Sequence, residues 1–242
     1  MAALVLGFGE HKKPTVTDEY LRASMIMRAG HLASYERKRI GRRVASLGGF
    51  RPRIKKDLAT NEYRIGWLTN TAGISYPPEP WHLGGEIYGS IWRVPLTSLH
   101  IAHLQEIVPI KFQGGAFVGT FLARYKPGGV LVYNELAMAV WVRRRYDLRL
   151  CSVLRIWVDS ESSAVGGREL WGIPKELGTF AIQDGNPFAA RVGAIEKDIT
   201  VLRFEPRLRL PGMWRVSFRL AQEFGLRLKL THARCRGQIA FG

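Results

Sequence analysis

One lysine is a candidate nucleophile, because most of the residues just before it are apolar. Lys175 follows Trp171, Ile173 and Pro174 and precedes Glu176. Burial among apolar groups would disfavour the ammonium form and favour the neutral amine. A neutral amine can condense with a carbonyl carbon to give a Schiff base. The alternative is an ordinary solvated charge, which composition alone favours.

A carboxylate earlier in the chain is the candidate partner of this lysine. A strand is predicted over 130–142, in which alternate side chains share one face. That row reads Leu131, Tyr133, Glu135, Ala137, Ala139 and Trp141. A carboxylate in such a row is costly to bury unless it is paired or protonated. Glu135 is therefore predicted to donate or accept protons, the alternative being a structural ion pair with Arg168.

Residues 167–178 carry a family-like pattern. They read Gly-Arg-Glu-Leu-Trp-Gly-Ile-Pro-Lys-Glu-Leu-Gly. The arrangement of Gly-Arg-Glu-Leu, Pro-Lys and Leu-Gly resembles the signature of the acetoacetate decarboxylase family, and the likeness covers roughly 76–242. The resemblance implies a β-rich closed barrel with a narrow active-site cavity. It also implies a Schiff base on Lys175, with Glu135 as the neighbouring acid and no cofactor.

The chain departs from the family pattern at three positions. Glu176 stands where a second lysine would follow the reactive one, Thr120 where a second acid would stand, and Gly85 near an arginine that binds the substrate carboxylate. Arg93 is the nearest replacement for that arginine in the sequence. These departures leave open whether the reaction is decarboxylation, an aldol reaction or dehydration of a keto acid or related carbonyl compound. They also leave open a ligand-binding barrel without catalysis.

The candidate site follows from these observations. The predicted catalytic residues are Lys175 and Glu135, and the predicted substrate-binding residues are Arg93, Thr120, Tyr133 and Trp171. No metal-ligand spacing, phosphate loop or nucleophile elbow is present in the sequence. Cys151 and Cys235 are interpreted as thiols and not as a disulfide framework.

The positive charge of the chain is uneven. The 242 residues carry a net charge of +16. Residues 1–75 hold 14 Lys and Arg against 6 Asp and Glu, and they are predicted to form a basic extension that is partly helical or disordered. A helix is expected from Thr17 into the basic block 36–43. Nucleic-acid binding through 17–56 is the weaker interpretation, and a solvated extension is favoured.

Prolines 77, 78 and 80 mark the start of a second region, 76–242, which is predicted to be mainly β, a β-rich α+β domain with few short helices. Strands are expected over 87–94, 116–125, 130–142, 148–158, 179–182, 190–195, 200–204, 214–220 and 226–231. Short helices are expected over 98–106 and after Ser160. No apolar run is long enough to cross a membrane as a helix, and no secretory signal is recognised, so a cytoplasmic protein is expected. A homo-oligomer is possible.

Overall fold

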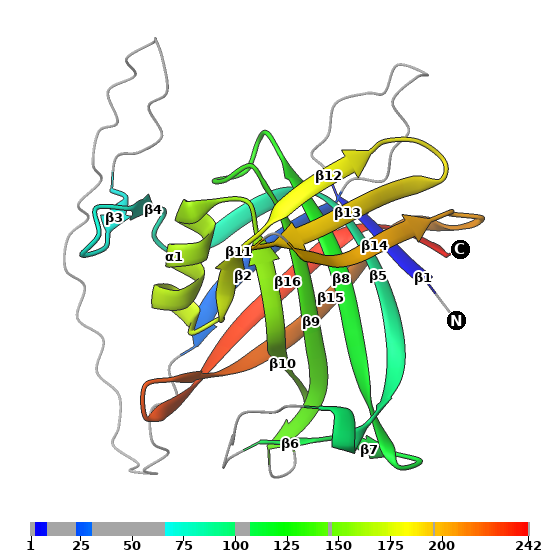
Figure 1. The fold of residues 1–242 in the computed structure, drawn as a ribbon, viewed down its shortest axis with the longest axis horizontal. Coiled ribbons are helices and arrows are strands. Elements are labelled where there is room, and N and C mark those ends of the chain that lie inside the picture. Colours follow the sequence, from blue (N-terminus) through cyan, green and yellow to red (C-terminus); the bar gives the residue numbers. More distant parts are fainter. Residues whose placement is uncertain are drawn as a thin grey trace, which may run out of the picture.

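The computed structural model describes residues 3–8, 23–30, 66–99, 107–144, 147–195 and 197–241. These residues form sixteen strands, one α-helix and one 3₁₀ turn (Figure 1). Within them, no helix is long and apolar enough to cross a membrane. The mainly β fold class predicted from the sequence is confirmed.

The elements follow one another in this order: β1 (Ala3–Phe8), β2 (Ala23–Gly30), β3 (Leu68–Thr69), β4 (Ser75–Tyr76), β5 (Trp81–Pro95), the 3₁₀ turn (Leu96–Ser98), β6 (Val108–Pro109), β7 (Lys111–Phe112), β8 (Gly115–Lys126), β9 (Tyr133–Arg144), β10 (Asp147–Val158), α1 (Glu161–Trp171), β11 (Lys175–Leu177), β12 (Thr179–Gln183), β13 (Phe188–Ala194), β14 (Lys197–Phe204), β15 (Leu208–Phe224) and β16 (Arg227–Phe241).

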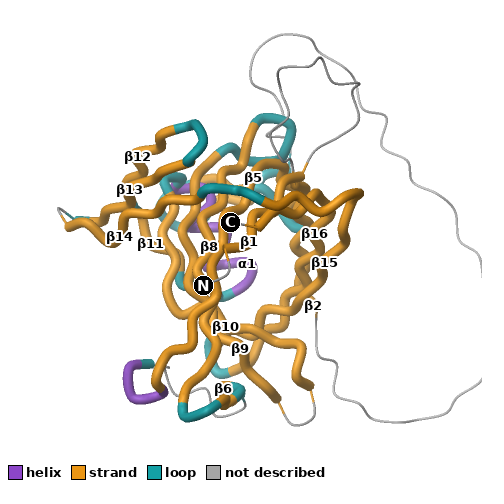
Figure 2. Tube along the Cα trace, turned by 90° about the vertical axis from the view of Figure 1, so that its right-hand side faces the viewer, coloured by secondary structure: helices purple, strands orange, loops and turns teal. Residues whose placement is uncertain are grey.

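Eleven strands form one large sheet. Its order is β1-β5-β2-β16-β15-β10-β9-β8-β7, with β6 on β9 and β11 on β10. Two further pairings join β1 to β16 and β5 to β8. The β5–β8 pairing is antiparallel and runs without a register shift from Gly84 opposite Lys126 to Pro95 opposite Gly115. Figure 2 shows that the strands of this sheet curve instead of lying flat.

One face of the large sheet, called the inner face here, carries the main core. Side chains alternate between the two faces of a strand, and the buried residues of β5, β8 and β9 on this face have odd numbers. The core residues of these three strands are Trp81, Leu83, Ile87, Ala123, Tyr125, Tyr133 and Ala139. The later strands add Val153, Ile156, Val158, Leu220, Ala233, Cys235 and Ile239. A carboxylate or ammonium group on this face is therefore surrounded by apolar groups.

The opposite, outer face of β5 and β8 packs against the small sheet β12-β13-β14. Tyr88 stacks on Phe188 with ring centroids 3.9 Å apart, and Arg124 pairs with Asp184. Glu86 lies between the sheets with a side chain only 4% exposed, and its carboxylate lies 2.6 Å from the Lys126 ammonium. The small sheet thus braces the two strands that carry Trp81 and Tyr125 on their other face.

A buried glutamine joins β10 to β15, which pair directly at only two positions. The register of β10 against β9 shifts between Val153 and Arg155. Gln222 Oε1 accepts hydrogen bonds from the Val153 N–H at 2.6 Å and from the Ser152 hydroxyl at 3.0 Å. Its Nε2 donates to the Val153 carbonyl at 3.2 Å. The Gln222 side chain therefore supplies backbone partners that an irregular ladder leaves open.

One predicted helix requires correction, and another lies mostly outside the described residues. The helix expected from Thr17 is wrong over Ala23–Gly30, which forms β2 and pairs with β5 and β16. The remainder of that helix, including the basic block 36–43, lies outside the described residues. At 98–106, the described part holds only the end of the 3₁₀ turn Leu96–Ser98. Residues 1–75 contribute β1 and β2 to the same sheet as the later strands.

Replacing Gln222 by leucine tests its role at the β10 irregularity. Gln222→Leu keeps a side chain of similar size but leaves the Val153 amide and carbonyl without partners. We expect the free energy of unfolding to fall by about 2–4 kcal/mol in urea denaturation. Gln183→Leu, at an exposed position of β12, is the control and should change it by less than about 0.5 kcal/mol. Equal effects of the two substitutions would contradict this account.

Candidate active site

The unit β10-α1-β11 fixes the backbone of Lys175. The Ser160 hydroxyl caps α1 by accepting from the Ser163 N–H. The helix ends at Trp171 and is followed by Gly172, whose φ of 67° is left-handed. The N–H groups of Gly172 and Ile173 donate to carbonyls of the last turn. The chain then enters β11, which runs parallel to β10 with Lys175 opposite Ile156. The three residues 172–174, between the end of α1 and the start of β11, therefore determine the direction of the Lys175 side chain.

The lysine stem passes over a glycine of α1. A Cβ atom on Gly167 would lie 2.6 Å from Lys175 Cδ, much closer than packed carbon atoms allow. The Gly-Arg pair of the sequence pattern therefore has two separate uses. Gly167 leaves room for the lysine stem, and Arg168 donates a hydrogen bond to the Lys175 backbone carbonyl at 2.8 Å.

The Lys175 ammonium has three oxygen partners. Its Nζ lies 2.6 Å from Glu135 Oε2, 2.9 Å from the Ser163 hydroxyl and 3.4 Å from the Tyr133 hydroxyl. An ammonium group has three N–H donors, so each has an acceptor. The Lys175 side chain is only 2% exposed and that of Glu135 is 12% exposed. The structure therefore holds a buried and fully hydrogen-bonded ion pair.

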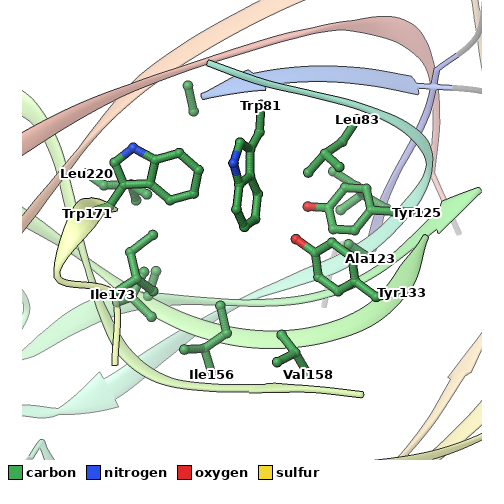
Figure 3. Close-up of a cluster of buried hydrophobic side chains, with 14 of the residues drawn as sticks. Trp81, Leu83, Ala123, Tyr125, Tyr133, Ile156, Val158, Trp171, Ile173 and Leu220 are labelled. Carbon is green, nitrogen blue, oxygen red and sulfur yellow. The ribbon is translucent and has the colours of Figure 1, made fainter. Parts of the chain in front are cut away.

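Aromatic rings surround this pair. Nζ lies 5.1 Å from the ring centroid of Tyr133 and 5.8 Å from that of Trp81, both within the range of cation–π attraction. Trp81 in turn meets Trp171 edge-on with centroids 4.7 Å apart. Figure 3 shows these rings together with the aliphatic side chains of Ile156 and Val158. The amine therefore lies next to two aromatic rings in addition to its three oxygen partners.

Two tyrosines complete the surroundings of Glu135. The hydroxyls of Tyr133 and Tyr125 donate to its carboxylate over 3.3 and 3.4 Å. Burial raises the pKa of both phenols well above the ordinary value, and the Glu135 charge raises the pKa further. Both hydroxyls therefore stay protonated near neutral pH, and each donates its one O–H group to the Glu135 carboxylate.

The structure brings together three of the six predicted site residues. Lys175, Glu135 and Tyr133 are in direct contact. Trp171 is buried one ring away, behind Trp81, and its indole N–H donates to Glu79. Glu135 pairs with the lysine and not with Arg168, which excludes that alternative for the described geometry.

Thr120 and Arg93 are not brought to the lysine. Thr120 lies one residue out of phase with Phe121 and Ala123, so it points to the outer face of β8. Arg93 is exposed and donates to the Gln113 carbonyl. Along β5 it lies six residues beyond Ile87, which is about 20 Å at roughly 3.3 Å per residue.

Three contacts of the lysine, with Ser163, Gly167 and Trp81, were not predicted from the sequence. Ser163 and Gly167 are four residues apart and so share one face of α1, and that spacing before Pro-Lys could have indicated a helix face turned toward the lysine. Trp81 precedes the first predicted strand and gave no local signal. Glu176 is about half exposed and pairs with Arg155 at 3.1 Å, so it does not act on the ammonium. Among the described residues, no three His, Cys, Asp or Glu side chains gather in a way that could hold a metal ion.

Comparisons with known proteins give one family match. The family model described as acetoacetate decarboxylase matches residues 96–228. The similar solved structures include the acetoacetate decarboxylase of Legionella pneumophila, with 13% identity, a TM-score of 0.47 and coverage of 69% of this chain and 87% of that one. They also include the enduracididine biosynthesis enzyme MppR, with 12% identity, a TM-score of 0.46 and coverage of 67% and 87%. A comparison with curated proteins gives no match.

Removing the acid of the pair should be costly to stability. Glu135→Leu leaves a buried ammonium without its counter-charge, so we expect the free energy of unfolding at neutral pH to fall by about 3–5 kcal/mol. The double variant Lys175→Met/Glu135→Leu removes both charges and should recover most of that loss. Urea denaturation of the two single variants, the double variant and the parent gives the coupling energy.

Glu176→Leu is the matched control for this cycle, because that glutamate is also ion-paired but is exposed. An exposed pair contributes at most about 1 kcal/mol. A Glu135→Leu effect no larger than that of Glu176→Leu would contradict the buried ion pair.

Proposed function

The chain belongs to the acetoacetate decarboxylase family, and we propose that it is a cofactor-independent lyase whose Lys175 forms a Schiff base with a keto acid or related carbonyl compound. One observation carries the proposal. A lysine amine only 2% exposed lies 2.6 Å from a carboxylate that can take its proton. A lysine kept only for stability would not need to be enclosed on the inner face of the sheet.

The first step forms the covalent bond. Glu135 accepts a proton from the ammonium, and the neutral amine attacks the carbonyl carbon to give a carbinolamine. Tyr133 or Ser163 hydrogen-bonds the oxygen that was the carbonyl. Loss of that oxygen as water, with a proton returned by Glu135, leaves an iminium.

The second step uses the iminium as an electron sink. A bond from the α-carbon breaks, and its electron pair moves to the nitrogen to form an enamine. If the bond leads to a carboxylate, CO₂ leaves; if it leads to a hydroxylated carbon, Glu135 takes the hydroxyl proton and an aldehyde or ketone leaves. Protonation of the enamine carbon and hydrolysis by water then release the product and the amine.

We also propose that the large sheet closes into a barrel around this site. The proposal is supported by the pairing of β5 with β8 over twelve positions and by the pairings of β1 and β2 with both β5 and β16. A closed wall would keep water from the amine. A location in the cytoplasm remains a proposal based on the sequence.

Trapping with borohydride tests the covalent step. The protein is incubated with pyruvate, acetoacetate or butanone and with sodium cyanoborohydride, and the modified peptides are mapped by mass spectrometry. We expect reduction to fix the substrate skeleton on Lys175 with at least one of these compounds. Glu135→Gln should slow labelling by roughly 10²-fold or more, the usual range for loss of a general base.

Two variants serve as controls. Lys175→Met should abolish the adduct at this peptide. Lys197→Arg removes an exposed lysine of β14 and should leave labelling of Lys175 unchanged. Absence of any adduct on Lys175 in folded protein would instead favour a binding barrel without catalysis.

A further inference from the structure

Among the described residues, the positive charges that strand alternation places on the inner face of the large sheet lie away from the reactive pair. By strand alternation, Arg93 of β5 and Arg143 of β9 share this face. Both are exposed, and each lies near the end of its strand, several residues along from the level at which Glu135 lies. Lys229 of β16 also falls on it, near the tip of the β15–β16 hairpin. Its ammonium lies 4.5 Å from the ring centroid of Phe224, a residue that is 42% exposed.

Arg168, which is close to Lys175 in the sequence, is not available to bind a substrate carboxylate at the amine. It is exposed, and it donates to the backbone carbonyl of Lys175. The first turn of α1 offers no anion contact at Ser163, because that N–H is already bonded to Ser160 Oγ. Among the described side chains, those that contact the Lys175 amine are therefore one carboxylate, two hydroxyls and aromatic rings.

The charge balance of the site is complete before a substrate enters. The ammonium of Lys175 and the carboxylate of Glu135 cancel each other at 2.6 Å. A substrate carboxylate would add a net negative charge to surroundings of hydrocarbon and phenol. An unpaired charge in such surroundings is strongly disfavoured.

Among the described residues, the buried side-chain group that lacks a hydrogen-bond partner on the inner face is uncharged. Thr231 of β16 stands opposite Leu220 of β15 in the register, so both point to this face. Its hydroxyl is fully buried and has no hydrogen-bond partner among the described residues. It is therefore an uncharged group that can donate a hydrogen bond to a carbonyl or hydroxyl oxygen, whereas the O–H groups of Tyr133 and Tyr125 already donate to Glu135.

From this arrangement we propose that the substrate of Lys175 is an uncharged ketone or aldehyde with apolar substituents, and not a keto acid. The inference rests on the Schiff-base function proposed above and narrows it. An uncharged substrate has no carboxylate to release as CO₂. The bond that breaks is then the one to a hydroxylated carbon, so that a hydroxy ketone gives two carbonyl products by the aldol-type route already described.

A matched pair of ketones tests the substrate class. 4-Oxopentanoate and its methyl ester have the same ketone, remote from the group that differs, so their intrinsic reactivities toward amines are close. Each is incubated with the full-length protein and cyanoborohydride, and labelling is measured at Lys175 and at exposed Lys197 in the same sample. The ratio of labelling at Lys175 to labelling at Lys197 corrects for any difference in the general reactivity of the two compounds toward lysine amines. We expect this ratio to be at least ~10-fold higher for the ester than for the acid.

The outcomes separate this inference from the function on which it rests. Labelling of Lys175 by the acid as strongly as by the ester would overturn the uncharged substrate while keeping the Schiff base. Lys229→Met identifies the anchor in that case, since it should reduce labelling by the acid if Lys229 holds the carboxylate. Labelling of Lys175 no greater than that of Lys197 with either compound would overturn the Schiff-base function itself.

Discussion

The buried ion pair between Lys175 and Glu135 is the constraint on which the arrangement of the fold around it depends. Removing two charges from water costs several kcal/mol for each ion, and a close contact with further hydrogen bonds is needed to offset that cost. The pair meets this requirement with a 2.6 Å contact and with hydroxyls on both partners. Because its two members come from different strands, β9 and β11 must be held in one fixed relation.

Several features far apart in the sequence hold that relation. The helix α1 returns the chain so that β11 lies against β10, which in turn pairs with β9. Gln222 bonds the irregular part of β10, and the small sheet braces β5 and β8 from outside. A rigid site in this protein is therefore a property of the whole large sheet and not of one loop.

The sequence predicted what depends on local pattern. Pro-Lys after an apolar stretch indicated Lys175, and alternation along one strand placed Glu135 and Tyr133 on the same face. Thr120 was placed by the family likeness and not by alternation, and it lies one residue out of phase with the inward row of β8, so it does not face Lys175. The helix predicted over residues 23–30 was wrong for a different reason. The apolar residues there have a near-helical spacing, but the segment pairs with two long strands, and this pairing outweighs the local pattern. Trp81 contacts the lysine only through the tertiary fold.

Because β11 pairs in parallel with β10, the length of the connection between α1 and β11 determines whether the Lys175 amine faces the site. Lys175 faces inward because three residues separate it from the end of α1 and because it stands opposite Ile156. Successive side chains of a strand point to opposite faces. Loss or gain of a single residue between Gly172 and Lys175 would therefore exchange the lysine with a neighbour and turn the amine to solvent. In descendants of this chain, the spacing of this turn should be preserved more strictly than the identity of the residues in it.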